Sequence, residues 1–187
     1  MQTVVEQTVT GLGYDCVEID RSAGGLLRIT IDHPWTLGAT EKLIDVEDCE
    51  RVTRQLQFAL EVDAIDYRRL EVSSPGIDRL LRSQADFERF AGAVVDITLN
   101  VAIGSAVAQT APGAVNANRK KFRGILSKVA SDGWQIAWSD EPPPKPGQRV
   151  SKKRVPPPLQ VLGFVMGEVR TARLAPIVDF KGRQSQS

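Results

Sequence analysis

Few residues in this chain have the types and spacing that catalysis or metal binding requires. His33 is the only histidine, it precedes a proline, and the sequence offers it no evident partner. Cys16 and Cys49 lie far apart and neither belongs to a Cys-x-x-Cys pair, so ordinary half-buried thiols are favoured over a redox or zinc site. There is no glycine-rich phosphate loop and no nucleophile elbow. The sequence therefore predicts a protein that is not an enzyme and that has no metal and no cofactor.

One stretch, LEVSSPGIDRLL at 70–81, sets several functional groups close together at the end of an expected strand. Pro75 favours an extended backbone at Ser74, and Pro75 with Gly76 suits the centre of a type II turn with positive φ at the glycine. The serine hydroxyls and the pair Asp78 and Arg79 could either stabilise this turn through contacts within the protein or face a ligand. We favour the stabilising role on physical grounds. The candidate contact residues are Ser73, Ser74, Pro75, Gly76, Asp78 and Arg79.

Two clusters of basic residues could contact the phosphates of RNA. The first lies in a proline-rich segment at 139–160, and the second lies at the start of an expected strand. Extended basic segments suit phosphate contacts, and we favour this over a role in solubility alone. In the second cluster, alternate residues of the strand point outward, so about half of that charge shares a face. The candidate RNA-binding residues are Arg119, Lys120, Lys121, Arg123, Arg149, Lys152, Lys153 and Arg154.

Trp134 and Trp138 are four residues apart in an expected strand and share its face with Ile136. Bases of RNA can stack on an aromatic sheet face. Because Ile136 lies on the same face, we expect these side chains to belong to the hydrophobic core instead.

The net charge of +1 conceals an asymmetry between the two halves of the chain. Residues 1–92 hold 10 Lys and Arg against 17 Asp and Glu, a net charge of −7. Residues 93–187 hold 14 Lys and Arg against 6 Asp and Glu, a net charge of +8. The acidic half could meet a basic protein and the basic half could approach phosphate, although solubility alone is an equal explanation.

The elements expected in the first half alternate between helix and strand. A helix over 45–61 is the clearest, because its apolar residues share one face and Asp45 with Asp48 resembles a capping box. A glycine turn at 22–25 joins two strands into a hairpin. In chain order we expect a helix over 3–12, strands over 16–20 and 26–32, a helix over 45–61 and a strand over 67–73. This α-β-β-α-β order predicts an α+β protein that begins with an α/β sandwich.

The second half changes to short strands after a short helix over 83–92, for which Ser83 and Asp86 form a capping-box signature. Strands are expected over 94–101, 120–130, 134–138 and 173–180. Several short strands with turns between them are typical of a small barrel. We therefore expect domains at 1–92 and 93–187, the second with inserted loops at 102–118 and 139–160.

The chain resembles the bacterial RimP family of ribosome maturation factors. The likeness rests mainly on LEVSSPGIDRLL, and RITID, DCERVTRQL, FRGILSKV and EVRTARLAP support it. The sequence departs from the family at Leu80, which replaces a proline, and its loops at 33–42, 102–118 and 139–160 look longer than those of the family.

The resemblance implies an α/β domain followed by an SH3-like (Sm-like) β-barrel. It also implies a factor that binds the free small ribosomal subunit and assists its late assembly without catalysis. The implied partners are rRNA and the twelfth small-subunit ribosomal protein. The alternative function is a general RNA-binding barrel with an acidic regulatory domain.

The chain has no apolar run of about 18 residues, and its N-terminus lacks the pattern of a secretory signal. We therefore expect a cytoplasmic protein that does not bind a membrane, and we expect a monomer.

Overall fold

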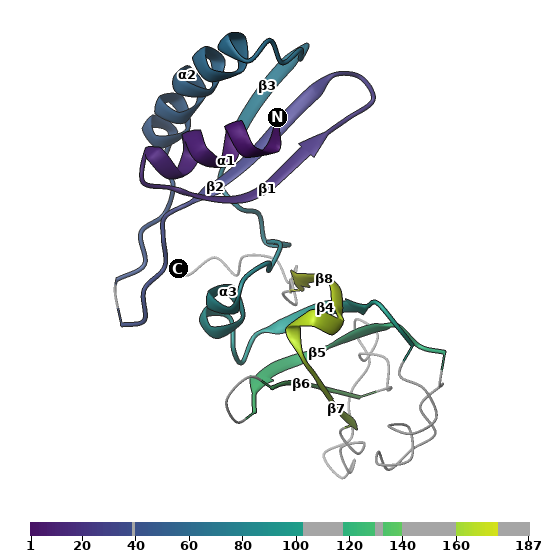
Figure 1. Cartoon of the computed structure of the whole chain (residues 1–187). Helices are drawn as coiled ribbons and strands as arrows, with labels where there is room; N and C mark the ends of the chain where they lie inside the picture. Colours follow the sequence, from purple (N-terminus) through teal and green to yellow (C-terminus); the bar gives the residue numbers. More distant parts are fainter. Residues whose placement is uncertain (39, 103–117, 130–132, 140–159, 176–187) are drawn as a thin grey trace, which may run out of the picture. The chain divides into compact units, whose positions relative to one another are not determined.

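The computed structural model describes residues 1–38, 40–102, 118–129, 133–139 and 160–175. These residues fall into two compact units, the first formed by Met1–Arg89 and the second by the described residues from Phe90 on. The first unit holds three helices and a three-stranded sheet, and the second holds a five-stranded sheet (Figure 1). The chain is therefore an α+β protein, as predicted, with an α/β unit first. No helix in the described parts is long and apolar enough to cross a membrane.

The first unit follows the predicted order of elements. They are α1 (Gln2–Gly11), β1 (Asp15–Arg21), β2 (Leu26–Asp32), α2 (Val46–Val62), β3 (Arg69–Ser73) and α3 (Gln84–Arg89). The predicted capping box of α2 is confirmed, since the Asp48 N–H donates to Asp45 at 2.8 Å and the Asp45 N–H donates to Asp48 at 3.2 Å.

The three strands of the first unit are arranged in the order β1-β2-β3. β1 and β2 form an antiparallel hairpin whose turn contains Gly25 at φ +80°, a conformation that favours glycine. β2 and β3 are parallel, with Ile29 opposite Val72. Parallel neighbours need a long crossover connection, and α2 lies within it. α1 and α2 cover the same face of the sheet (Figure 1).

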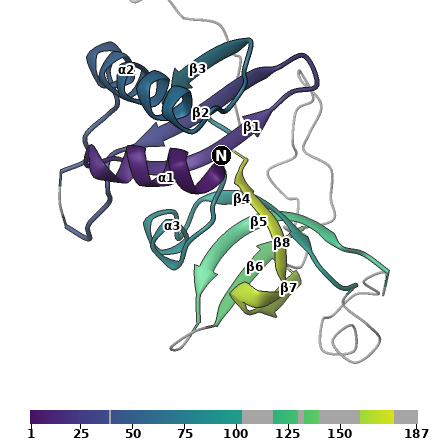
Figure 2. The same cartoon turned by 45° about the horizontal axis from the view of Figure 1, so that its top comes forward.

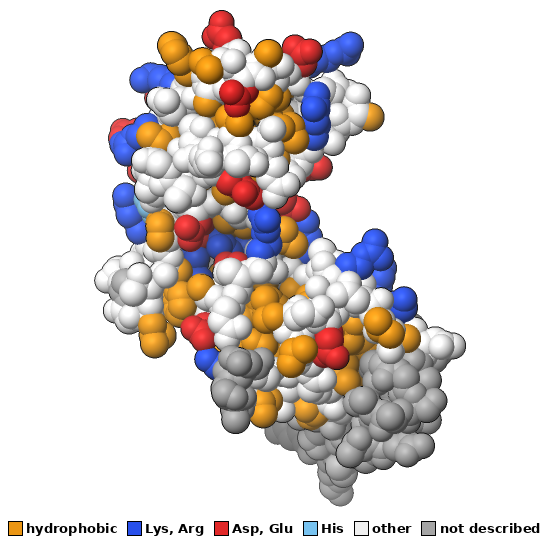
Figure 3. Space-filling model, in the orientation of Figure 1, with side chains coloured by type: hydrophobic (Ala, Val, Ile, Leu, Met, Phe, Trp, Pro, Cys, Tyr) orange, Lys and Arg blue, Asp and Glu red, His pale blue; other side chains and the backbone are white. Residues whose placement is uncertain are grey.

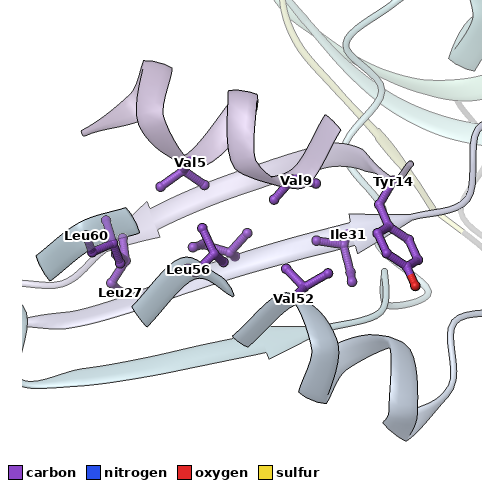
Figure 4. Packing of buried hydrophobic residues seen from close by; sticks show 9 residues of the cluster. Val5, Val9, Tyr14, Leu27, Ile31, Val52, Leu56 and Leu60 are labelled. Atoms are coloured by element: carbon purple, nitrogen blue, oxygen red, sulfur yellow. The ribbon is translucent and has the colours of Figure 1, made fainter. Parts of the chain in front are cut away.

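The core of the first unit lies between this sheet face and the two helices (Figure 4). Its side chains come from α1, β2, α2 and the residue before β1, and all are buried. Those labelled in the view are Val5, Val9, Tyr14, Leu27, Ile31, Val52, Leu56 and Leu60. Burying such side chains gives roughly 1.5–3 kcal/mol each, which holds the helices on the sheet.

The second unit is built from antiparallel neighbours in the order β7-β6-β5-β4-β8. β4, β5 and β6 lie side by side in both views (Figures 1 and 2). Among the described residues β7 and β8 are not paired with each other, so closure into a barrel is not observed. The elements are β4 (Val94–Leu99), β5 (Lys121–Lys128), β6 (Trp134–Trp138), β7 (Gln160–Phe164), the 3-10 helix η1 (Met166–Glu168) and β8 (Val169–Leu174).

Two details of the second unit differ from the sequence prediction. The last strand, predicted over 173–180, is β8 at Val169–Leu174, and the part of the prediction beyond Ala175 lies outside the described residues. β7 was not predicted at all, because it directly follows the proline-rich segment and contains Gly163, a poor strand former. The inserted loops predicted at 102–118 and 139–160 lie almost wholly outside the described residues.

The tryptophans of β6 belong to the core of the second unit, as predicted. Trp134, Ile136 and Trp138 are all buried on one face of the strand. The rings of Trp138 and Phe122 pack with centroids 5.1 Å apart. These rings are therefore not available to stack on RNA bases.

Gly124 marks a close approach between β5 and β6. A Cβ atom placed there would lie 2.3 Å from the carbonyl oxygen of Ala137, which belongs to the backbone of β6. Backbone cannot yield as a flexible side chain can, so only glycine fits without moving the neighbouring strand. The FRGILSKV segment thus has a physical reason for its glycine.

We expect Gly124→Ala to destabilise the second unit by about 1–3 kcal/mol, the usual effect of overpacking. The matched control is Gly163→Ala in β7, where the nearest atom lies 3.9 Å from the added Cβ and little change is expected. For each variant, urea unfolding measures the stability of the protein, and amide hydrogen exchange of β5 and β6 assigns the change to the second unit. Equal effects of the two variants would contradict this packing argument.

Candidate partner-binding surface

The LEVSSPGIDRLL segment leaves the sheet at the end of β3 and runs to α3. The predicted type II turn at Pro75 and Gly76 is wrong, because the turn lies at Ile77 and Asp78 and Gly76 does not have positive φ. A Cβ on Gly76 would lie 2.9 Å from the Asp78 carboxylate oxygen, which is the end of an exposed, flexible side chain and can move aside. The close contact at Gly76 is therefore a weaker constraint than a contact with backbone.

The two charged residues of the segment have opposite surroundings. Arg79 is buried with 7% of its side chain exposed, whereas Asp78 is exposed. The Arg79 guanidinium contacts Asp32 at the end of β2 and donates from Nη2 to Asp86 of α3 at 2.9 Å. Arg79 therefore joins the segment after β3 to the end of β2 and to α3. This stabilising role is the alternative that the sequence favoured.

Asp32 is the centre of a larger set of ion pairs, which we call the Asp32 network: Asp32, Glu41, Arg79, Asp86 and Arg89. The Asp32 Oδ2 atom accepts from Arg79 and, at 2.7 Å, from Arg89 Nη1. Its Oδ1 atom accepts from the backbone N–H of His33 at 2.9 Å. The second Arg89 nitrogen contacts Glu41 in the loop after β2. One buried carboxylate thus ties four segments of the first unit together.

Asp86 connects the Asp32 network to the first turn of α3 through its ion pair with Arg79. It accepts from the backbone N–H groups of Arg82 and Ser83, both at 3.0 Å, while its own N–H donates to Ser83 Oγ at 3.1 Å. Burial opposes its ionisation, but the Arg79 guanidinium and these backbone donors hold the pKa of Asp86 below its ordinary value. The capping pattern predicted for Ser83 and Asp86 is present.

The outer side of the loop is open to solvent. Ser74, Gly76 and Asp78 are exposed, and Ile77 exposes 67% of its surface, a large fraction for an isoleucine. Ser73 and Pro75 are half-buried. Five of the six predicted contact residues therefore lie on or near the surface of this loop. The sixth, Arg79, is buried and fixes the loop through its ion pairs.

A second buried polar cluster, which sequence reasoning missed, gives His33 a partner. Asp48 of α2 accepts from the Tyr14 hydroxyl at 2.6 Å, and its other oxygen lies 3.2 Å from His33 Nε2. Arg51 donates to the Tyr14 oxygen at 3.3 Å. The hydrogen bond from Tyr14 lowers the pKa of Asp48 to about 2 despite its burial, and the same bond raises the pKa of Tyr14. Asp48 is thus both a helix cap and the anchor of the His33 ring.

A cavity of about 350 Å³ lies beside Arg79, and its lining includes carboxylates and a thiol that could do chemistry. Glu6, Cys16 and Asp86 line it, but Asp86 binds Arg79, and Glu6 lies 3.7 Å from Arg82. Burial raises the pKa of the Cys16 thiol to about 11, so the thiolate nucleophile is scarce at neutral pH. In the described parts of the chain no three His, Cys, Asp or Glu side chains are placed to hold a metal ion.

Charges of both signs are mixed on the surface of the first unit. The face shown in Figure 3 carries acidic and basic side chains close together, with apolar ones between them. On this face the acidic side chains therefore do not form a single acidic patch.

The basic candidates of the second unit separate into different positions. Lys121 and Arg123 lie on the exposed face of β5, which agrees with the expected alternation. Arg119 instead lies over the rings of Phe122 and Trp138, at 5.0 and 5.5 Å from their centroids. Lys120 is exposed and reaches the Asn100 carbonyl at 3.4 Å. The remaining candidates, Arg149, Lys152, Lys153 and Arg154, lie outside the described residues.

Removing the Arg79 guanidinium should destabilise the first unit by about 3–5 kcal/mol, because Asp32 and Asp86 lose a buried partner. Arg79→Ala tests this, with Arg54→Ala as the matched control. Arg54 forms an exposed pair with Glu50, so its loss should change stability by about 1 kcal/mol or less. Hydrogen exchange of β2 amides in the full chain reports both, and similar values for the two variants would refute a stabilising role for Arg79.

The lowered pKa of Asp48 predicts a defined pH dependence. Its contribution to stability is fully present above the ordinary carboxyl pKa of about 4 and is lost as the pH falls through about 2. The stability difference between the wild type and Asp48→Asn should therefore be constant above pH 5 and shrink between pH 4 and 2. Glu50→Gln on the same helix is the control, and a difference for Asp48→Asn that stays constant down to pH 2 would contradict the assignment.

Comparison with known proteins gives a consistent family. Residues 4–78 match the family model described as the RimP N-terminal domain. The chain is 68% identical over 195 residues to the ribosome maturation factor RimP of Paracidovorax citrulli, covering 98% of this chain and 95% of the relative. It is 65% identical to the RimP of Delftia acidovorans, covering all of this chain and 98% of that protein. The RimP of Variovorax paradoxus is 63% identical, with 100% and 92% coverage.

Proposed function

The chain belongs to the RimP family of ribosome maturation factors, and from this membership we propose that it binds the free small ribosomal subunit and assists its late assembly without catalysis. We further propose that it acts as a cytoplasmic monomer, with two domains at 1–92 and 93–187. In this proposal the sheet of the second unit belongs to an SH3-like barrel. The order β7-β6-β5-β4-β8, with η1 between β7 and β8, supports that assignment.

The observation that carries the proposal is the loop from Ser73 to Asp78, exposed on its outer side and fixed on its inner side. The Asp32 network holds Arg79 immediately after this loop. A binding loop that is already ordered loses less conformational entropy when it meets its partner. We propose that Ser73, Ser74, Pro75, Gly76 and Asp78 form the contact surface, while Arg79 positions it.

The mechanism requires no bond chemistry. A factor that binds one local arrangement of rRNA and ribosomal protein better than another shifts the population toward that arrangement by the difference in binding free energy. The acidic first unit suits a basic ribosomal protein such as the twelfth protein of the small subunit. The basic second unit suits rRNA.

The competing function is a general RNA-binding protein whose acidic unit only regulates it. It is favoured by the excess of basic residues in the second half of the chain. Binding through phosphates alone weakens steeply with salt and accepts many RNAs. Binding to one subunit should instead distinguish particles that contain similar amounts of RNA.

We expect the double variant Ile77→Ser/Asp78→Ala, which changes a proposed contact residue and its exposed apolar neighbour, to weaken binding to free small subunits by about tenfold or more. The matched control is Val62→Ser/Asp63→Ala, which removes an exposed apolar side chain and its acidic neighbour from the end of α2. Gradient co-sedimentation at physiological salt with ribosomal fractions measures binding. Both variants change exposed residues and leave Arg79 in place, so we expect the fold to be preserved.

Co-migration of the wild type with free small subunits, and not with complete ribosomes, would support the proposal. Equal association with every RNA-bearing fraction would favour the general RNA-binding protein. Unchanged binding by the Ile77/Asp78 variant would remove the loop from the contact surface.

A further inference from the structure

The exposed face formed by β4, β5 and β8 carries a compact set of cationic and hydroxyl side chains. In β4 the residues Val95, Ile97 and Leu99 are buried, so Asp96 and Thr98 point to the opposite, solvent side. The same alternation places Lys121 and Arg123 of β5 on this side. Ala172 is the buried residue of β8, so its two neighbours in sequence also point outward. We call this set the outer face: Asp96, Thr98, Lys121, Arg123, Thr171 and Arg173.

The strand registers arrange the outer face in two rows. Asp96 lies opposite Arg123 in β5 and opposite Arg173 in β8, so an arginine stands on each side of one carboxylate. Thr98 lies opposite Lys121 and Thr171, which forms the second row. Directly opposite residues on one face have Cβ atoms about 4.5–5.5 Å apart, so the members of each row are within reach of one ligand group.

The Arg123 side chain lies across β4 within this arrangement. Its Nε atom is 3.7 Å from Asp96 Oδ1, and its Nη2 atom reaches the carbonyl oxygen of Ala175, just beyond β8, at 3.5 Å. The guanidinium therefore extends from β5 toward β8. Arg173 is placed on the outer face by its register opposite Asp96. It was not among the predicted RNA-binding residues, because the strand was predicted over 173–180 and its pairing with β4 could not be foreseen.

Charge on this unit is strongly unbalanced. Its described residues include seven Lys and Arg but only Asp96 and Glu168 as acids, and Asp96 is the one carboxylate on the outer face within the described residues. Arg123 and Asp96 are 60% and 54% exposed and 3.7 Å apart. Exposed ion pairs at this separation are weak because water screens them, so an arriving phosphate can replace the carboxylate with little loss.

We propose that the outer face binds the phosphate backbone of RNA, with Arg123 and Arg173 contacting phosphates and Asp96 limiting their affinity as a built-in competitor. Lys121 and the two threonine hydroxyls extend the same site along the strands, since both side-chain types contact phosphates in nucleic-acid complexes. The choice of RNA over another polyanion rests on the proposed function in ribosome maturation. The distinctive consequence is that removing the Asp96 charge should strengthen binding.

The test uses the full chain and a labelled 24-nucleotide single-stranded RNA, with binding followed by fluorescence anisotropy over a series of salt concentrations. Arg123→Gln and Arg173→Gln should each weaken binding roughly three- to tenfold and reduce the salt slope by about one. Asp96→Asn should tighten binding by roughly the same factor. The exposed pair Glu50 and Arg54 in α2 supplies matched controls, because Glu50→Gln and Arg54→Gln make the same charge changes elsewhere.

Each result has a defined meaning. Tighter binding by Asp96→Asn together with weaker binding by both arginine variants would support the site, provided that the two control variants change affinity less than twofold. Unchanged or weaker binding by Asp96→Asn would overturn it, as would control variants with equal effects. Competition by polyglutamate as effective as that by unlabelled RNA would overturn the assignment to RNA. This assay contains no ribosomal subunit. A negative result here would contradict the RNA site on the outer face, whereas failed co-sedimentation would contradict the proposed function.

Discussion

The organisation of the first unit depends on compensating one buried negative charge. Asp32 stands at the end of a central strand, and two arginines that follow 47 and 57 residues later share its carboxylate. Removing one member of a buried ion pair is strongly destabilising because the remaining charge is desolvated without a partner. The end of β2, the corner after β3 and helix α3 are therefore coupled. The exposed loop before Arg79 owes its fixed position to this coupling and not to a rigid turn of its own.

Local patterns in the sequence predicted most of the elements but few of the contacts between them. Asp45 and Asp48 are three residues apart, so their capping box could be found from the sequence, and the face shared by Trp134, Ile136 and Trp138 was correctly assigned to the core. The pairing of Arg79 with Asp32, or of His33 with Asp48, joins residues that no local rule connects. Gly76 was assigned to the centre of a turn because Pro-Gly favours one, whereas the turn in the structure lies at Ile77 and Asp78.

The two units present different kinds of surface to a partner. In the first unit, the loop from Ser73 to Asp78 exposes small, polar and apolar groups and is held by the buried Arg79, which favours recognition by shape and hydrogen bonding. In the second, the outer face offers flexible cations around a single carboxylate, which favours recognition of charge density. A partner composed of both protein and nucleic acid would engage the two kinds together, and simultaneous binding would raise the overall affinity beyond that of either surface.

The chain order of the Asp32 network also affects how the protein folds during synthesis. β2 emerges from the ribosome well before its parallel neighbour β3, and both arginines that neutralise Asp32 emerge later still. Until Arg89 has also emerged, docking β2 into the core would bury a carboxylate without its full set of partners. A nascent chain that ends before Arg79 should therefore remain open at this end of the sheet. We therefore expect this end of the sheet to close fully only after α3, the last element of the first unit, has emerged.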